Sequence, residues 1–337
     1  MLTTDHAVQV ARGEVMVTTT GDGMPLPIRI ETTDVEGLEA AVGVLRALDY
    51  RQGGGFCRDA VRVVKTASLL LHWGVVPEPL RARLFTVLAD VHNLLGWTEF
   101  DIGHGGPARR RFERALELAT EAGNDNLVAN IRYRLGRVHL HRHDVTGALT
   151  EFAHGRAAAL RSDSRRALAI LTANDAWALA MGGAERAALL RLEEAEAAFA
   201  QAGTWPEPRP WEAFFGAADM AAMRGTVLTE LASPASPAHS GDAITQLTDA
   251  AGRYGAEMAR SRSLTLIMLA QNHALRGDFD EAGRVGVEAV DLARGLGSVR
   301  PKDRLAPLER LLRECPADPG VTALLDQITR YRSEPLP

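Results

Sequence analysis

Two stretches of the chain share one internal spacing: LGWTEFDIGHGGPARRRFERA (residues 95–115) and LGRVHLHRHDVTGALTEFAHG (residues 135–155). The matching positions are Leu95-Gly96, Ala108, Phe112 and Ala115 in the first and Leu135-Gly136, Ala148, Phe152 and Gly155 in the second. The same frame returns with Leu269-Ala270, the turn RGDFDEA (residues 276–282), Gly286 and Ala289. This spacing predicts repeated antiparallel helix pairs, in which the small residue lets the partner helix approach and the Ala-Phe-small stripe faces it. We therefore expect Phe112 and Phe152 to be buried between helices.

The repeat resembles the tetratricopeptide repeat, which implies an all-α, tetratricopeptide-like helical-repeat superhelix of the kind that usually serves as a binding scaffold. The length of 337 residues exceeds one ordinary globular core and suits a solenoid. The net charge of −5 gives no electrostatic reason to expect nucleic-acid binding, and two cysteines, Cys57 and Cys315, support no disulfide framework. Because no export signal or long apolar run is evident, we expect a cytoplasmic protein that does not bind membranes.

The chain is expected to divide into four parts. Residues 1–31 form an N-terminal arm: a short β-hairpin with strands at 14–20 and 27–31, an arm exchanged between subunits, or a loose leader. The other parts are N-terminal helices (32–79), tetratricopeptide-like helix pairs (80–296) and C-terminal capping helices (297–337).

Local signals place the helix ends. Thr33-Asp34 offers an N-cap for a helix that begins at Val35 and stops at the three glycines 53–55, which cannot sustain a helix cheaply. The Pro- and Ser-rich segment 233–240 predicts an exposed loop. Other helices are expected at 58–73 and 78–96, with helix pairs at 80–122, 125–160, 164–202, 209–256 and 259–296 and a last helix or two between 303 and 332.

Three flanking segments resemble a narrower family. Residues 32–61 (TTDVEGLEAAVGVLRALDYRQGGGFCRDAV), 88–97 (LADVHNLLGW) and 298–312 (SVRPKDRLAPLERLL) are similar to the tetratricopeptide-repeat sensor region of actinobacterial helix-turn-helix regulators of the XRE type. In those regulators a DNA-binding module precedes the helix start that Asp34 matches. Here too few residues precede Asp34 for three packed helices, and they include strand formers. The resemblance therefore implies the sensing half of a regulator without direct DNA binding.

The first helix of each tetratricopeptide pair lines the concave surface, so its inner positions predict a binding groove. The expected ligand-binding residues are Asp90, Asn93, Trp97, Asp101, Asn130, Tyr133, Arg134, Arg137, His141, Asn174 and Trp177, with Phe100 and Leu140 on the same line. Amides suit a peptide backbone, arginine suits a carboxylate, and aromatic rings offer rigid stacking area. In the alternative interpretation, Trp97 and Trp177 pack between helices, and Asp90 and Asp101 are solvated or paired with arginines of the groove.

Other motifs favour ordinary structural roles. His139 and His143 are four residues apart and could share a helix face as zinc ligands do, with His92, His104 or Asp144 as a third ligand. Inward packing and a helix end explain them as well, so we predict no metal site. The segment GHGGPARRRF (103–112) follows no strand and is expected to be a turn before a solvated basic helix rather than a phosphate loop. No nucleophile motif is present, and we expect no catalytic residue and no cofactor.

These patterns favour a regulatory protein that binds a peptide, a protein segment or a small-molecule signal in its concave groove, with a homodimer also compatible with the sequence. An alternative is an enzyme or small-molecule carrier of secondary metabolism that reuses the fold, with Trp97, Tyr133, Arg137 and His141 lining a closed pocket. A third interpretation is a dimerisation or structural adaptor. An open groove would favour the first, and an enclosed cavity with converging titratable groups the second.

Overall fold

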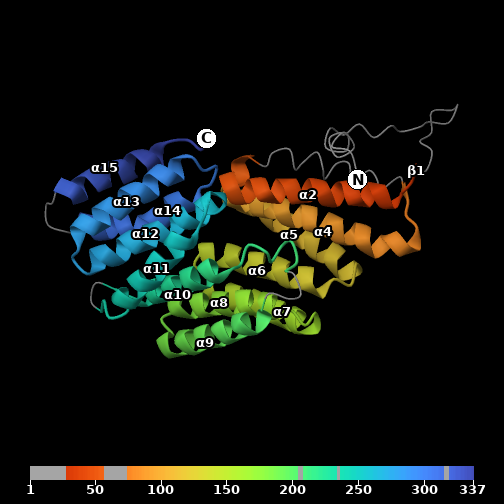
Figure 1. The fold of residues 1–337 in the computed structure, drawn as a ribbon, viewed down its shortest axis with the longest axis horizontal. Helices are drawn as coiled ribbons and strands as arrows, with labels where there is room; N and C mark the ends of the chain where they lie inside the picture. Colours follow the sequence, from red (N-terminus) through yellow and green to blue (C-terminus); the bar gives the residue numbers. More distant parts are fainter. Residues whose placement is uncertain (1–27, 57–73, 204–207, 234–235, 315–318) are drawn as a thin grey trace.

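A computed structural model describes residues 28–56, 74–203, 208–233, 236–314 and 319–337. In this part of the chain, helices stacked in consecutive pairs form a superhelix (Figure 1). The pairs are α4 (Glu78–Asp101) with α5 (Gly105–Glu121), α6 (Asp125–His141) with α7 (Val145–Arg161), α8 (Arg165–Met181) with α9 (Glu185–Ala202), α10 (Ala217–Leu231) with α11 (Ser240–Arg253), α12 (Ala259–Leu275) with α13 (Phe279–Arg294), and α14 (Arg300–Arg313) with α15 (Pro319–Ser333). They are preceded by β1 (Ile28–Arg29), α2 (Thr32–Gln52), the 3-10 helix η1 (Gly54–Phe56) and β2 (Gly74–Val75), and a second 3-10 helix, η2 (Ala256–Met258), leads into α12.

The turns between helices recur at a constant interval. The residue with positive φ occupies the same place in successive turns, at Gly103, Gly123, His143, Asp163 and Gly183. Glycine adopts this left-handed backbone without strain, and histidine and aspartate are among the side chains that tolerate it. The spacing of these turns sets the length of each helix pair, so the repeat detected in the sequence is a structural repeat.

In the first two helix pairs, α4/α5 and α6/α7, a phenylalanine ring packs on a glycine of the partner helix. Phe112 and Phe152 are both 0% exposed, as predicted. A Cβ atom added to Gly96 would lie 2.8 Å from the ring of Phe112, and one added to Gly136 would lie closer still to the ring of Phe152. The all-α, tetratricopeptide-like fold predicted from this spacing is therefore confirmed.

Some helix ends differ from the prediction. Helix α2 begins at Thr32 rather than Val35, because Asp34 lies within its first turn and accepts a hydrogen bond from the backbone N–H of Glu31 (2.8 Å). Helix α4 continues beyond the predicted end at residue 96 to Asp101. Helix α10 begins at Ala217 rather than at 209, because prolines 208 and 210 interrupt the helix and residues 210–214 form turns. The predicted helix at 58–73 lies outside the described residues.

The N-terminal strand has a partner other than the predicted hairpin strand. Strand β1, within the predicted strand 27–31, pairs in parallel with β2, with Ile28 opposite Gly74 and Arg29 opposite Val75. Val76 directly precedes Pro77, which disfavours helical backbone at Val76 and separates the strand Gly74–Val75 from the start of α4. The other predicted strand, 14–20, lies outside the described residues.

The superhelix closes on itself. The backbone N–H of Gly297 donates to Gln52 O, that of Gly55 donates to Gly297 O (2.9 Å each), and that of Val299 donates to Asp101 O (2.8 Å). Beside them, the guanidinium of Arg260 bridges the buried carboxylates of Asp49 and Asp101. We call this set the closing contact; it joins α2 and α4 to α12 and to the start of α14, and Figure 1 shows the end of α2 beside the C-terminal helices. Glycines 53–55 therefore end α2, as predicted, and also permit the approach of Gly297, whose Cα would lie 3.1 Å from a Cβ at Gly55.

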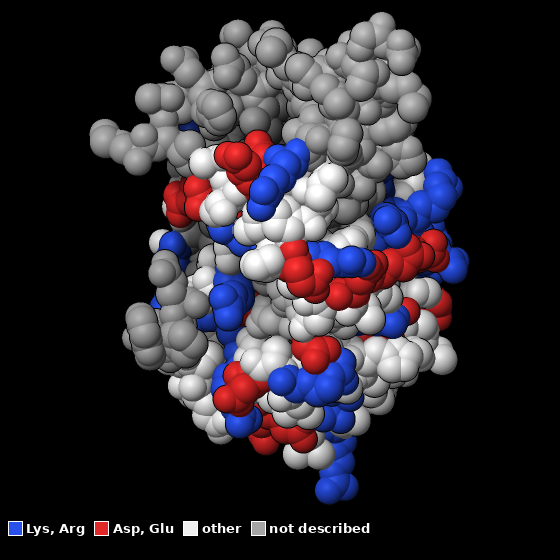
Figure 2. Space-filling view, turned by 90° about the vertical axis from the view of Figure 1, so that its right-hand side faces the viewer, with Lys and Arg blue, Asp and Glu red and all other residues white. Residues whose placement is uncertain are grey.

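The described surface mixes both charge signs. On the face shown in Figure 2, basic and acidic side chains are interspersed. Exposed ion pairs such as Arg83–Glu39 (2.6 Å) and Arg161–Asp125 (2.6 Å) join neighbouring helices. Within the residues placed in the structure, none of the helices combines the length and the apolar character needed to cross a lipid bilayer.

Candidate functional site

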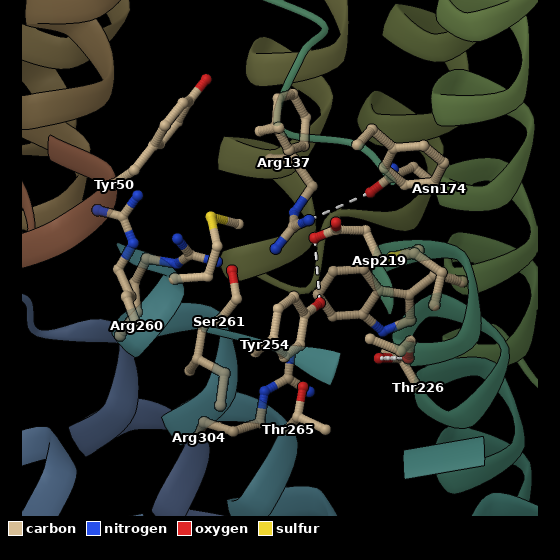
Figure 3. A pocket seen from close by; sticks show the side chains of 18 of the residues that line it. Tyr50, Arg137, Asn174, Asp219, Thr226, Tyr254, Arg260, Ser261, Thr265 and Arg304 are labelled. Atoms are coloured by element: carbon tan, nitrogen blue, oxygen red, sulfur yellow. Dashed lines mark hydrogen bonds between the residues drawn. The ribbon is translucent and has the colours of Figure 1, made fainter. Parts of the chain in front are cut away.

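Two adjoining cavities lie on the inner side of the superhelix, with volumes of about 130 and 490 Å³. Both are lined by Arg137, Trp177, Leu264, Arg300 and Arg304. The first cavity, shown in Figure 3, is also lined by aromatic residues and by residues from α10 and α12; they include Tyr50, Trp97, Tyr133, Arg134, Asn174, Phe214, Phe215, Asp219, Met223, Tyr254, Arg260 and Met268. A ligand in this space would contact helices from most of the chain.

Four arginines meet two tryptophans at this site. We call this set the Arg-Trp cluster; its members are Arg134 and Arg137 from α6, Arg300 and Arg304 from α14, Trp97 from α4 and Trp177 from α8. Each tryptophan ring contacts one arginine from α6 and one arginine from α14. The guanidinium carbons lie 5.2 Å (Arg134) and 5.1 Å (Arg300) from the Trp97 ring centre, and 4.5 Å (Arg137) and 4.9 Å (Arg304) from that of Trp177.

The spacing of the arginines on their helices explains this arrangement. Arg134 and Arg137 are three residues apart and Arg300 and Arg304 are four apart, so each pair lies on one face of its helix. The closing contact holds the start of α14 against the end of α4 through Val299 and Asp101. The two arginine pairs therefore converge on the inner cavity only because the superhelix is closed.

The positive charge of the cluster is only partly neutralised. Arg304 pairs with Glu230 (3.2 Å), whose carboxylate also accepts a hydrogen bond from Trp177 Nε1 (3.1 Å). Arg134 donates to the backbone oxygen of Asn93 (2.7 Å) and Arg137 to Asn174 Oδ1 (3.4 Å). Among the described residues, Arg134 and Arg137 have no carboxylate within ion-pair distance.

Burial acts on the ionisation of these arginines. Burial lowers the pKa of Arg134 and of Arg137. Burial, followed by the nearby charge of Arg137, lowers the pKa of Arg300 to about 9. The charged form of each guanidinium is therefore less stable here than in water.

An acidic group, Asp219, also lines the first cavity. Asp219 accepts hydrogen bonds from the Tyr254 hydroxyl (3.0 Å) and the backbone N–H of Gly216 (3.1 Å) (Figure 3). Burial raises the pKa of the Asp219 carboxyl to about 6. Burial and the charge of Asp219 raise the pKa of Tyr254. The cavity thus contains a titratable pair in addition to its arginines.

The structure brings together most of the predicted groove residues. Those that line the first cavity are Trp97, Tyr133, Arg134, Arg137, Asn174 and Trp177, and His141 lines the second. Trp97 and Trp177 are each 6% exposed, so they pack between helices and line the cavity at once. A role of these residues in ligand binding stays a prediction.

The remaining predicted residues, Asp90, Asn93, Asp101 and Asn130, are buried outside the two cavities. Asp90 pairs with Arg46 (2.5 Å), and Asp101 pairs with Arg260 (2.8 Å), so neither is solvated and neither pairs with the groove arginines as suggested. Asn93 Nδ2 donates to Asn130 Oδ1 (2.9 Å). These side chains connect helices to one another.

The chain itself covers part of the predicted groove. Trp211 and Phe215, which lie between α9 and α10, are buried. Asn130 Nδ2 donates to the backbone oxygen of Trp211 (3.0 Å), and Trp211 Nε1 donates to Asn126 Oδ1 (2.5 Å). Asn130 therefore binds peptide backbone, as its residue type suggested, but the backbone belongs to this chain. The inner surface is consequently a set of cavities rather than an open groove.

Several cavity residues are not evident from the sequence patterns. These patterns place Arg300 and Arg304 in capping helices and do not single out Asp219, Tyr254 or Arg260. One signal was present in the sequence, because Arg300 and Arg304 stand four apart and so share a helix face. The sequence around Arg300 and Arg304 does not indicate that this helix face packs near α6.

The histidines do not share one helix face. His139 Nδ1 lies 2.7 Å from Asp144 Oδ2, and His143 lies beyond the end of α6 in a turn with φ of 58°. Among the described residues, no group of three or more His, Cys, Asp and Glu side chains is placed to hold a metal ion. Pro107 lies in the first turn of α5, consistent with the expected turn before that helix. Cys57 lies outside the described residues.

No protein-family profile matches the sequence, and no curated protein matches it. The fold is similar to that of a Rap protein solved in complex with competence and sporulation factor, with 13% identity, 88% of each chain covered and a TM-score of 0.50. Weaker matches are yeast Tom70 (14% identity, 98% of this chain and 71% of that chain, TM-score 0.39) and the TPR domain of P58(IPK) (13% identity, 89% and 83%, TM-score 0.26). At this identity the likeness to the Rap protein shows the fold alone, which is all-α and tetratricopeptide-like.

Proposed function

We propose that this protein is a regulatory binding protein that takes up a peptide, a protein segment or a small-molecule signal in the inner cavities of its superhelix. The observation that carries the proposal is the Arg-Trp cluster, which brings charged and aromatic side chains from four helices to one cavity wall. Concave sites that combine aromatic surface with a few converging polar groups are typical of ligand pockets.

Two further observations support a regulatory role over an enzymatic one. The flanking segments resemble the sensor region of actinobacterial helix-turn-helix regulators, in which the repeats act as a receiver. The similar fold of the Rap protein, which was solved with competence and sporulation factor bound, is compatible with ligand uptake by this architecture. The expected partner is therefore a signal molecule or peptide.

Native mass spectrometry of the freshly purified chain tests this proposal. We expect a non-covalently retained species in the wild-type protein. Ala222→Trp fills the first cavity, which Ala222 lines from α10, and should abolish retention while the helical circular-dichroism spectrum is kept. Val44→Trp is the matched control, because Val44 is 70% exposed on α2 and away from both cavities.

Equal retention by the Ala222→Trp variant would contradict binding in this cavity. A wild-type protein that retains nothing, and that no peptide or small-molecule fraction of its source cells stabilises against heat, would contradict the proposed function.

A second candidate function is an enzyme or small-molecule carrier of secondary metabolism. It is favoured by the Asp219–Tyr254 pair that lines the first cavity, because a buried carboxyl with a raised pKa is a common general acid or base. An enzyme would release a chemically altered ligand. Conversion that disappears in Asp219→Asn, with binding retained, would favour this alternative.

A further inference from the structure

The buried arginines of this fold differ in how their charge is balanced. Arg46 pairs with Asp90 (2.5 Å), and Arg260 lies between Asp49 (3.1 Å) and Asp101 (2.8 Å). These arginines join helices and carry their own counter-charge. A buried cation without such a partner is costly, so most buried charges are paired.

Among the residues placed in the structure, Arg134, Arg137 and Arg300 lack a counter-charge held this closely, but Arg134 donates to the backbone oxygen of Asn93 and lines only the first cavity. In the part of the chain that the structure describes, Arg137 donates to Asn174 Oδ1 at 3.4 Å and to the Tyr133 hydroxyl, and neither acceptor is a carboxylate. The nearest carboxylate to Arg300 is that of Asp101, at 3.6 Å, and Asp101 Oδ1 already accepts from Ser298 (3.0 Å). The Arg300 side chain is only 13% exposed, so water compensates little of its charge.

Arg137 and Arg300 face the same space. Both line both cavities, at the wall where the cavities adjoin. The positive charge of Arg137 also lowers the pKa of Arg300, as expected for two cations that line the same two cavities. An anion between them would supply the missing counter-charge.

The surroundings of the pair are aromatic. Arg137 lies over Trp177 and Arg300 over Trp97, and the ring of Tyr133 stacks between those of Trp97 (6.4 Å) and Phe214 (6.1 Å). These rings offer apolar contact area next to the charged pair. Arg304 differs from the pair because Glu230 already neutralises it.

We infer that the ligand is an organic oxyanion, a carboxylate or phosphate on an apolar or aromatic body, whose acidic group binds between Arg137 and Arg300. The inference rests on the proposed function, because it names the chemical class of the ligand that the cavity takes. Guanidinium groups bind both oxyanions through paired, charge-assisted hydrogen bonds. The bound anion would also connect α6 to α14.

Binding of simple probes to the full chain tests the inference. Titration calorimetry and thermal unfolding are measured with phenylacetate, with phenyl phosphate and with the neutral phenylacetamide, which has the same body without the charge. We expect both anions, but not the amide, to bind and to raise the midpoint of unfolding. The stronger binder of the two then identifies which oxyanion the site prefers.

Variants locate the binding site of the anion. Arg137→Gln and Arg300→Gln should each weaken anion binding at least tenfold, the loss expected for a charge-assisted hydrogen bond of about 1.5–3 kcal/mol. Arg300→Lys keeps the charge without the planar fork and should retain part of the affinity. Arg313→Gln, which makes the same charge change on α14 at a side chain that is 60% exposed, should bind like the wild type.

The possible results separate this inference from the proposed function. Equal binding of the acid and the amide would overturn the oxyanion assignment while supporting a ligand cavity, as would a neutral species retained in native mass spectrometry. Anion binding unaffected by Arg137→Gln and Arg300→Gln would place the anion elsewhere and also overturn it. If no probe binds and no ligand is retained, the proposed function itself fails.

Discussion

A double-mutant cycle at Gly96 and Phe112 tests how one repeat packs. Phe112 is 0% exposed, so Phe112→Ala should lower the free energy of unfolding by about 3–5 kcal/mol. In Gly96→Ala the new Cβ would lie 2.8 Å from two ring carbons, whereas ordinary contact begins at 3.4 Å. Such overpacking typically costs about 1–3 kcal/mol. The higher helix propensity of alanine offsets about 1 kcal/mol of this cost.

The sign of the Gly96→Ala effect should therefore depend on residue 112. With the ring present, we expect the substitution to be neutral or destabilising. In the Phe112→Ala background the clash is absent, so Gly96→Ala should stabilise by about 1 kcal/mol through helix propensity. Urea denaturation followed by circular dichroism measures all four proteins.

Gly43→Ala is the matched control for this cycle. Gly43 lies within α2, and a Cβ added there would meet nothing within 4 Å. The control should gain about 1 kcal/mol in both backgrounds. If Gly96→Ala has the same effect with and without the Phe112 ring, the proposed packing of the repeat is refuted.

Three further predictions concern buried charges. Arg260→Met leaves Asp49 and Asp101 without their shared cation and should lower the free energy of unfolding by about 3–5 kcal/mol in urea denaturation, with partial recovery when both aspartates are also changed to asparagine. The pKa of Asp219 is raised to about 6, so its contribution to stability is complete below pH 3.8 and should be lost, by about 3 kcal/mol, as pH rises through about 6; Asp219→Asn should remove this dependence. Burial, with two nearby arginines, lowers the pKa of His92 to about 4, so the contribution of His92 to stability should be lost, by about 3 kcal/mol, as pH decreases from about 6.5 to about 4. This change opposes that of Asp219 over nearly the same range, so denaturation curves of the wild type should show little net slope, whereas the stability of His92→Gln should fall and that of Asp219→Asn should rise as pH increases; a variant that keeps the wild-type slope contradicts its assignment.

The fold could be predicted because its determinants are local in sequence. The Leu-Gly and Ala-Phe-small spacing fixes which faces of two consecutive helices meet, and Phe112 and Phe152 are packed as that spacing requires. A glycine, histidine or aspartate with positive φ occupies each of the five successive turns from residue 103 to residue 183. These residues and the helix faces they connect lie within short stretches of the sequence.

The candidate site depends on contacts that no local window contains. The sequence predicts one shared face for Asn93, Asn130 and Arg134. In the structure, Asn93 donates a hydrogen bond to the side chain of Asn130, and Arg134 donates one to the backbone oxygen of Asn93. Their burial could not be predicted, because it follows from the docking of Trp211 and from closure of the superhelix. The approach of Arg300 to Arg137 has the same long-range origin.

Closure also changes how the array should unfold. A linear repeat array frays from its ends, because a terminal repeat has a neighbour on one side only. Here Asp49 of α2 contacts Arg260, 211 residues away in sequence, so α2 has neighbours on both sides. Stability is then not a sum of nearest-neighbour terms along the chain. We expect backbone amides of α2 to exchange with solvent as slowly as those of central helices, and breaking the closing contact to release fraying at both ends of the described array together.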